Sequence, residues 1–264
     1  MGSQSIMLIE IALFSIMEVS AVPPDTSLGR GQAASASAGS VSDGNGNASA
    51  ADSLGSLMES KCPEAVRELS ALKAKELHVA EPKTVSRPVL QSQLLQMEKE
   101  DQEARVAILP SAGSNIPDND PRLIRMEEVD AANLRNVKSI IRQYGFPTVS
   151  MVGWSGVRAA FLLVQHADTD AKFQASVLRI FEKRVLAGEI DADSYAKLTD
   201  RVLRAQGKPQ KYGTQFEVRD GDWKPEPIGD EEHVEQRRKA IGLGSFENYS
   251  CTVHAIFGPA EKGG

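Results

Sequence analysis

The strongest constraint on the fold of this chain is a helical segment at about residues 156–166 that has no polar face. Its apolar side chains are distributed around the whole helix axis: Val157, Ala159, Ala160, Phe161, Leu162, Leu163 and Val164. A helix of this kind is buried on all sides, since any exposed face would leave apolar surface in water. The sequence therefore predicts a helical domain built around one central, buried helix.

Further helices are predicted around the central one, from apolar residues that recur three and four positions apart. Three of them precede it, at about residues 62–78, 89–105 and 126–144. Two follow it: one begins with an N-cap within residues 168–170 and ends at Gly188, and the other begins at residue 191 or 193 and ends at Gly207. Short polar side chains before a helix and glycines after it are common boundaries.

After residue 207 the pattern changes from helical spacing to alternation. Apolar and polar side chains alternate from Tyr212 to Val218, and Asp220-Gly221 is typical of a tight turn. The return strand from Trp223 meets two prolines, so we expect it to be short. A charged helix at about residues 231–240 follows. The predicted fold class is therefore mainly α, with a single helical domain at residues 62–250 and one small β-hairpin.

The segments outside this domain differ in composition. Residues 25–60 are mainly Ala, Ser, Gly and Asn, which bury too little apolar surface to offset the entropy of ordering the backbone. We therefore expect a disordered N-terminal tether there. Residues 251–264, polar from Gly258 onward, are expected to form a loose C-terminal tail. Residues 1–24 contain an apolar run that resembles the core of a secretory signal.

Two interpretations of the apolar run stay open. It ends on Val-Ser-Ala at residues 19–21, which suits a cleavage site, but Glu10 and Glu18 interrupt it and no Lys or Arg precedes it. Export would make the protein periplasmic or secreted and would allow Cys62 and Cys251 to pair. Otherwise the protein is cytoplasmic and both thiols are expected to be free. The run is too short and too charged to span a membrane.

The charge distribution bears on the partners. The first sixty residues hold six acidic residues and one basic residue, so they carry most of the formal net charge of −6. The rest of the chain holds 30 acidic and 29 basic residues, and this near-neutrality does not suit a nucleic-acid partner. Neither a Cys/His spacing typical of zinc nor a glycine-rich phosphate loop occurs in the sequence, which therefore predicts no metal and no cofactor.

A resemblance to a known family rests on six blocks of residues that occur in order along the chain. The blocks are Leu94–Met97 with Asp101, Gln102 and Arg105; Val129-Asp130 with Asn133; Gly145–Thr148 with Val152-Gly153; Gln165–Asp168 with Phe173-Gln174; Asp200–Val202; and Gly207–Gln215. Over about residues 89–243 the chain resembles a widespread bacterial family known as a domain of unknown function, of the DUF6624 type. The resemblance implies no reaction.

The foremost candidate for catalysis is His166, which stands at the end of the central helix with Asp168 two residues on. The helix dipole favours a charged imidazolium there, and a histidine with a carboxylate partner is what general acid–base catalysis requires. The alternative is a structural histidine that caps its own helix and binds Asp168 or a neighbouring carbonyl group.

Other polar residues are candidates for binding a ligand. They are Asp101, Gln102 and Arg105 on one helix, Gln165 and Arg201 on two others, and Gln210, Tyr212 and Gln215 in the segment before the hairpin. A guanidinium group suits an anionic group of a substrate, while Gln and Tyr supply neutral donors and acceptors. The alternative is that these residues form a buried polar lattice that joins the helices.

Two functions follow from these alternatives, and whether the protein is an enzyme stays open. In the first, the domain binds or processes a small polar or anionic molecule in a pocket around His166 and Tyr212. In the second, it is a non-enzymatic protein-interaction module whose buried polar residues serve only the fold.

Overall fold

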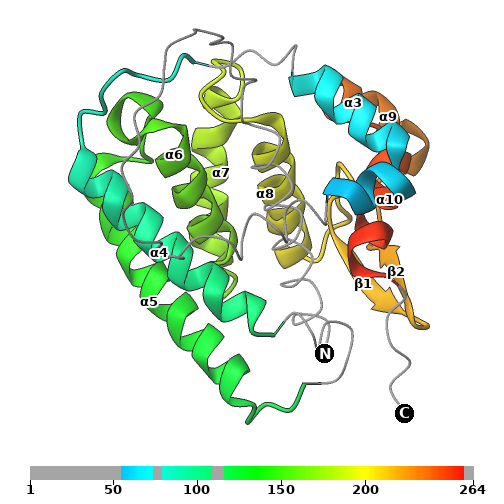
Figure 1. The fold of residues 1–264 in the computed structure, drawn as a ribbon, viewed down its shortest axis with the longest axis horizontal. Helices are drawn as coiled ribbons and strands as arrows, with labels where there is room; N and C mark the ends of the chain where they lie inside the picture. The colour runs from blue at the N-terminus through cyan, green and yellow to red at the C-terminus, as the bar shows by residue number, and fades with distance from the viewer. Residues whose placement is uncertain (1–54, 74–78, 109–115, 259–264) are drawn as a thin grey trace, which may run out of the picture.

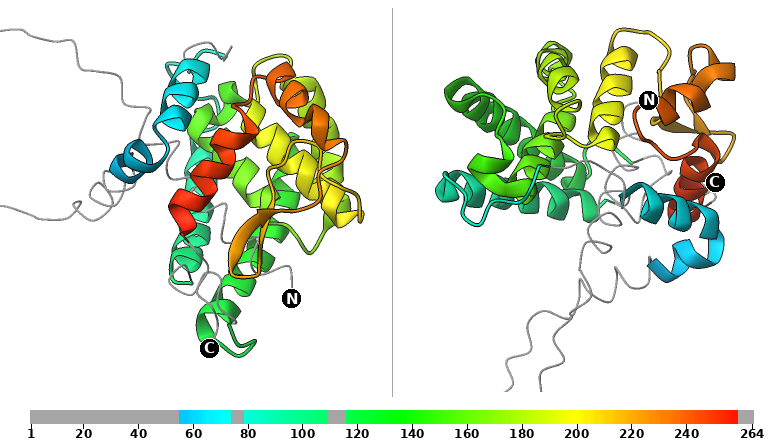
Figure 2. Two further views of the ribbon diagram at one scale, coloured as in Figure 1. Left: turned by 90° about the vertical axis from the view of Figure 1, so that its right-hand side faces the viewer. Right: turned by 90° about the horizontal axis from the view of Figure 1, so that it is seen from above.

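A computed structural model describes residues 55–73, 79–108 and 116–258 of the chain. Its helices form two groups, which lie beside one another in Figure 1 and in the right-hand view of Figure 2, with α8 at the edge of the larger group nearest the smaller. The larger group contains α4 to α8, and the smaller contains α3, α9, α10 and a hairpin of two strands. The prediction of a mainly α fold with one small hairpin is confirmed.

The central helix is α6 (Val149–Gln165), and most of its residues are buried, as predicted. It starts earlier than the predicted residue 156, because a short helical segment from Val149 precedes a kink at Gly153, where φ is 67° and the backbone is not helical. The second half of the helix begins after this kink, where the backbone N–H of Trp154 donates to the carboxylate of Glu81 at 3.0 Å. An acidic acceptor suits the N-terminus of a helix, so Glu81 caps this half.

Two long helices pack against α6. They are α4 (Pro88–Val106) and α5 (Pro121–Tyr144), each with proline in its first turn. Proline is tolerated there because the first backbone N–H groups have no partner within the helix. Leu94 of α4, Val137 of α5 and Val152 of α6 are completely buried in the main core. This core holds α4 and α5 against α6, whose C-cap is His166.

The two helices after α6 begin where the sequence places their caps. Asp170 accepts from the backbone N–H of Phe173 at the start of α7 (Ala171–Arg184), and Asp191 accepts from Ser194 at the start of α8 (Ala192–Ala205). Gly207 follows α8 with a φ of 68°, a left-handed conformation that suits glycine. The predicted starts of both helices are therefore confirmed, although α7 ends a few residues before the glycine expected to terminate it.

The hairpin consists of β1 (Phe216–Arg219) and β2 (Asp222–Pro225), which pair antiparallel. The residues between the strands, Asp220 and Gly221, both have positive φ, as a tight turn of this type requires. The alternation that begins at Tyr212 predicts a longer first strand than the structure has. Residues 212–215 are not strand because their backbone N–H groups bind side chains of α8 and of the loop itself.

The chain ends in two helices that cover the hairpin side of the molecule. The charged segment forms a short 3-10 turn, η2 (Glu231–His233), and then α9 (Val234–Ala240). The next helix, α10 (Phe246–Phe257), corrects the expectation that the chain is loose from residue 251. Ser245 caps it, and its Val253 is buried against Phe216 and Trp223 of the hairpin. This apolar contact is the physical reason why residues 251–257 are ordered.

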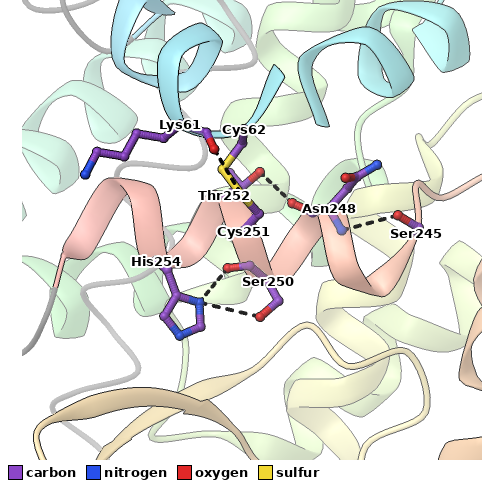
Figure 3. The surroundings of a disulfide bond; sticks show 8 residues. All are labelled: Lys61, Cys62, Ser245, Asn248, Ser250, Cys251, Thr252 and His254. Carbon is purple, nitrogen blue, oxygen red and sulfur yellow. Dashed lines mark hydrogen bonds between the residues drawn. A yellow bond between two sulfur atoms is a disulfide. The ribbon is translucent and has the colours of Figure 1, made fainter. Parts of the chain in front are cut away.

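A disulfide between Cys62 and Cys251 joins α3 (Pro63–Lys73) to α10, with a Cα–Cα distance of 6.0 Å (Figure 3). Residues 55–61 are helical, and Met58 packs with Cys62 in a small apolar cluster. The expected disordered tether at residues 25–60 is therefore wrong for residues 55–60. Its remaining part and the signal-like segment at residues 1–24 lie outside the described residues. No helix within the described ranges is long and apolar enough to cross a membrane.

Candidate functional site

His166 occupies the C-cap of α6, and its imidazole ring binds α4 rather than a neighbour in sequence. Its Nδ1 donates to the carboxylate of Asp101, 2.9 Å from Oδ2 and 3.0 Å from Oδ1. An ionised carboxylate can only accept hydrogen bonds, so the Nδ1 atom carries a proton. In neutral His166 the basic lone pair therefore belongs to Nε2. The sequence predicts Asp168 as the partner of His166, and the structure gives this role to Asp101.

Arg105 extends this pair into a chain of charges. Its Nη1 donates to Asp101 at 2.9 Å, one helical turn away on α4, and its Nη2 donates to Asp130 of α5 at 2.8 Å. Gln102 adds a neutral hydrogen bond to Asp101 at 2.9 Å. Asp101 and Arg105 are completely buried. We call His166, Asp101, Arg105, Asp130 and Gln102 the His166 network.

The two carboxyl groups of the His166 network differ in their pKa. Burial raises the pKa of Asp101, but the nearby His166 and Arg105 outweigh this effect and hold the pKa below its ordinary value. For Asp130 burial is the larger effect, so its pKa lies above the ordinary value in spite of Arg105. Asp101 is therefore the more firmly ionised of the two and the natural partner of a protonated Nδ1.

Asp168 lies in the turn between α6 and α7, where it binds elements on the other side of α6. Its Oδ1 accepts from Nε of Arg201 on α8 at 2.9 Å and from Gln174 of α7 at 3.2 Å. The same amide group of Gln174 donates to the backbone carbonyl of Gln165 at 2.9 Å. Asp168 and Arg201 thus join α6, α7 and α8, and Asp168 does not orient the ring of His166.

A second buried carboxylate, Asp200 of α8, organises the segment that precedes the hairpin. It accepts from the backbone N–H groups of Lys211, Tyr212 and Thr214 at 2.6, 2.9 and 2.9 Å, and from the hydroxyl of Thr214 at 2.9 Å. We call this arrangement the Asp200 cage. Burial raises the pKa of Asp200, and these hydrogen bonds oppose the shift.

Gln210 and Gln215 stabilise the segment before the hairpin through hydrogen bonds between its own residues. The side chain of Gln210 donates to the carbonyl groups of Gln215 and Glu226, and its oxygen accepts from the backbone N–H of Gln215 at 2.8 Å. Tyr212 is buried, with its ring 6.2 Å from that of Tyr195. Its carbonyl oxygen accepts from Arg238 of α9 at 2.7 Å. These residues brace the loop against α8 and α9.

The predicted site residues thus fall into three neighbouring sets. Asp101, Gln102 and Arg105 gather at His166; Asp168 and Arg201 lie between α6 and α8; and Gln210, Tyr212 and Gln215 belong to the loop. Gln174, Thr214 and Arg238 are not among the residues predicted from the sequence. Gln174 and Thr214 stand inside the blocks that carry the family resemblance, which is a signal that could have identified them.

Three buried polar atoms at or beside the His166 network have no hydrogen-bond partner in the part of the chain that the structure describes. They are Nε of Arg105, the side-chain oxygen of Gln165 and the side-chain nitrogen of Asn133. Gln165 precedes His166, and Asn133 follows Asp130 by one turn of α5. Buried polar atoms usually have a partner, whether protein, water or ligand. The His166 network therefore offers unused hydrogen-bonding capacity.

Two further observations bear on what this region can hold. Within the described ranges, no group of three or more His, Cys, Asp or Glu side chains is arranged to bind a metal ion. A cavity of about 130 Å³ lies elsewhere, between α3, the start of α8 and α10. None of the residues that line it is among the site residues predicted from the sequence.

Comparison with known proteins gives a family but no activity. Residues 88–261 match the model of a family of unknown function, DUF6624. Searches of curated proteins and of solved structures find no match.

Proposed function

Since the chain belongs to the DUF6624 family, which has no known function, we propose one from the geometry of the site: the domain binds and processes a small polar molecule at the His166 network. In this proposal His166 exchanges a proton with the bound molecule through Nε2. Asp101 fixes the tautomer and the orientation of the ring, and Arg105 holds Asp101. This is the arrangement of a general acid–base residue with its positioning partners.

The unused hydrogen-bonding capacity beside His166 supports this function most directly. A network that served only the fold would be expected to satisfy its own donors and acceptors, because each unsatisfied buried group costs about 1–3 kcal/mol. Gln165 offers an acceptor, while Arg105 and Asn133 offer donors. A molecule with both hydroxyl and amide-like groups would complement all three atoms.

The balance of charge favours a neutral polar molecule over an anion. The pairing of Arg201 with Asp168 is neutral as a unit. Within the His166 network, Asp101 and Asp130 face one arginine, so the set is neutral only when His166 or Asp130 has taken up a proton. An anion would add charge to a region that has no surplus of positive charge.

Ligand screening by thermal shift tests this function. Wild-type protein and His166→Gln are heated with neutral polar compounds such as polyols, sugars, amides and nucleosides, and with inorganic phosphate as the anionic comparison. A ligand present at about 100 times its Kd stabilises the folded state by about 2.7 kcal/mol. We expect a neutral compound to raise the Tm of the wild type and not that of His166→Gln. Equal shifts in both proteins would reject the proposed site.

The protein-interaction module remains a second candidate, favoured by the burial of the site residues. His166, Gln165, Arg201, Gln210, Tyr212 and Gln215 are all at most 3% exposed. Unfolding measurements on His166→Gln and Tyr212→Phe separate the two functions. Loss of about 1–3 kcal/mol in each variant would favour a purely structural lattice, whereas a change within about 1 kcal/mol would favour a ligand site.

A further inference from the structure

The cavity between α3, α8 and α10 is separate from the His166 network. Its volume is about 130 Å³, and it is lined by parts of α3, the first residues of α8, Arg238 of α9 and the chain from Gly242 to Thr252. Figure 3 shows Ser245, Asn248 and Thr252 of this lining, on the part of α10 that holds the disulfide. The disulfide therefore links the residue before α3 to α10, and both helices contribute to the lining.

The walls of the cavity are largely apolar. The lining includes Leu69 and Leu72 of α3 and, from the later part of the chain, Leu243 and Tyr249. An apolar cavity of about 150 Å³ is large enough to admit benzene, so this one has room for a group of similar size. The apolar part of a bound molecule would be removed from water here, which favours binding.

The acidic groups that line the cavity already have partners. Glu68 accepts from the backbone N–H of Ser245 at 2.9 Å and from the amide group of Asn248 at 2.6 Å. Asp191 caps α8 by accepting from Ser194. Asp193 pairs with the buried Lys197 at 2.7 Å. Asp193 also acts on Arg238 electrostatically, but none of these three carboxylates forms an ion pair with it.

Arg238 is the arginine of the lining. It is 2% exposed, and it donates from Nε to the carbonyl of Gly244 and from Nη1 to that of Tyr212. Its guanidinium lies 5.1 Å from the centre of the Tyr249 ring. Among the described residues no carboxylate forms an ion pair with it. Burial lowers its pKa, and nearby acidic groups such as Asp193 and Glu235 offset that shift only in part, so the charge is incompletely compensated.

We propose that this cavity binds a small carboxylic acid, with its apolar body between α3 and α10 and its carboxylate on Arg238. The carboxylate would form a direct ion pair, which no carboxylate of the described residues makes with Arg238, and a guanidinium group matches it in geometry. Aromatic acids and short fatty acids share this chemistry. The site needs α3, which lies outside the region of the family match, and is independent of the function proposed for His166.

Binding of defined probes by the full chain tests this inference. Titration calorimetry and ligand-observed NMR would compare benzoate and hexanoate with benzamide, which is neutral but nearly identical to benzoate in shape. We expect at least one of the two acids to bind at least about tenfold more tightly than benzamide, as a charge-assisted hydrogen bond implies. The relative affinity of benzoate and hexanoate distinguishes an aromatic from an aliphatic ligand. Equal binding of acids and amide, or no binding of either acid, would overturn the proposal.

Variants locate the binding in the cavity. Leu72→Trp fills the space without removing Arg238, so it should weaken the binding of the better acid at least about tenfold. Leu186→Trp, the same change at an exposed position, should leave it unaltered. Arg238→Gln should remove the preference for acid over amide. His166→Gln should change nothing here, so this result stands whether or not the function proposed for His166 holds. Unaltered binding by Leu72→Trp would place the acids elsewhere and reject the site.

Discussion

The His166 network and the Asp200 cage each hold a completely buried aspartate, but they stabilise its charge in different ways. Asp101 is bound by two groups that carry or can carry positive charge, His166 and Arg105. Asp200 is bound by three backbone N–H groups and one hydroxyl, all of them neutral. The pKa of Asp101 is accordingly lowered by its charged neighbours, whereas burial dominates at Asp200 and raises its pKa.

The difference indicates separate roles for the two aspartates. One of the side chains bound to Asp101, the imidazole of His166, can exchange a proton, so this arrangement suits a site where a proton moves. Backbone groups that surround Asp200 cannot titrate, and they fix the path of residues 211–214. The Asp200 cage fixes the conformation of the loop, whereas the His166 network contains a group that can exchange a proton. Substitutions in the two sets should therefore lower the free energy of unfolding by different amounts. The loss should be largest at Asp200 and smallest at the neutral side-chain donors.

Asp200→Ala should be the most destabilising change. It removes the acceptor from four donors at once and leaves them buried, so we expect the free energy of unfolding to fall by about 4 kcal/mol. Urea denaturation monitored by circular dichroism measures the loss. Asp118→Ala, at an exposed position, serves as the control and should be neutral. A loss for Asp200→Ala no larger than that of the control would contradict the structural role of the cage.

Asp101→Asn should lower the free energy of unfolding by less than Asp200→Ala does, by about 2 kcal/mol. The amide keeps the volume and one acceptor, and Arg105 retains its pair with Asp130. The imidazole of His166 loses the charged acceptor of Nδ1, so its two tautomers should become comparable in population. Nitrogen NMR of the histidine ring reads the tautomer directly. A single Nδ1–H tautomer retained in the variant would mean that Asp101 does not orient the ring.

The contributions of Asp101 and Asp200 to the free energy of unfolding should also change with pH, in opposite directions. A lowered pKa gives Asp101 a stabilising contribution above its unfolded pKa, and this contribution is lost as the pH falls through the folded value. A raised pKa gives Asp200 a contribution that is present below its unfolded pKa and lost as the pH rises through the folded value. From about pH 7 to about pH 3, the cost of Asp101→Asn should therefore shrink and that of Asp200→Asn should grow. Parallel trends in unfolding experiments would contradict opposite pKa shifts of the two groups.

The smallest effects should come from the neutral side-chain donor of each set. Thr214→Val removes a buried hydroxyl that donates to Asp200, so we expect a loss of about 1 kcal/mol. Gln102→Met removes a partly exposed donor to Asp101, and water can replace it at a cost of about 0.5 kcal/mol. A larger loss for Gln102→Met than for Thr214→Val would mean that the His166 network is the more rigid of the two.

Local features of the sequence predict much of the fold. Each of these features depends on residues that are close together in the sequence, so the sequence alone predicts it. They are the helix caps Asp170 and Asp191, the apolar helix α6 and the turn at Asp220-Gly221. Helix α10 has local signals too, since Ser245 is a good cap and apolar residues follow at helical spacing. These signals continue past residue 251, so they contradict the loose tail expected there without reference to the hairpin.

The pairing of site residues could not be predicted in the same way. His166 and Asp101 are far apart in sequence, and only the packing of α4 against α6 brings them together. Asp168, although closer, lies past the end of α6, where Arg201 and Gln174 bind it. Spacing along one helix identified Asp101, Gln102 and Arg105 as a group. It contained no information about which other helix they would meet.

The disulfide between Cys62 and Cys251 has a mechanical consequence for the whole domain. The two cysteines are 189 positions apart, so the bond encloses α3 to α9 and the hairpin in one covalent ring. A force applied to the two ends of the chain runs through the sulfur–sulfur bond and does not load the residues between them. While the bond is intact, pulling on the termini can extend only the segments outside the ring, and both buried aspartates are shielded from the load.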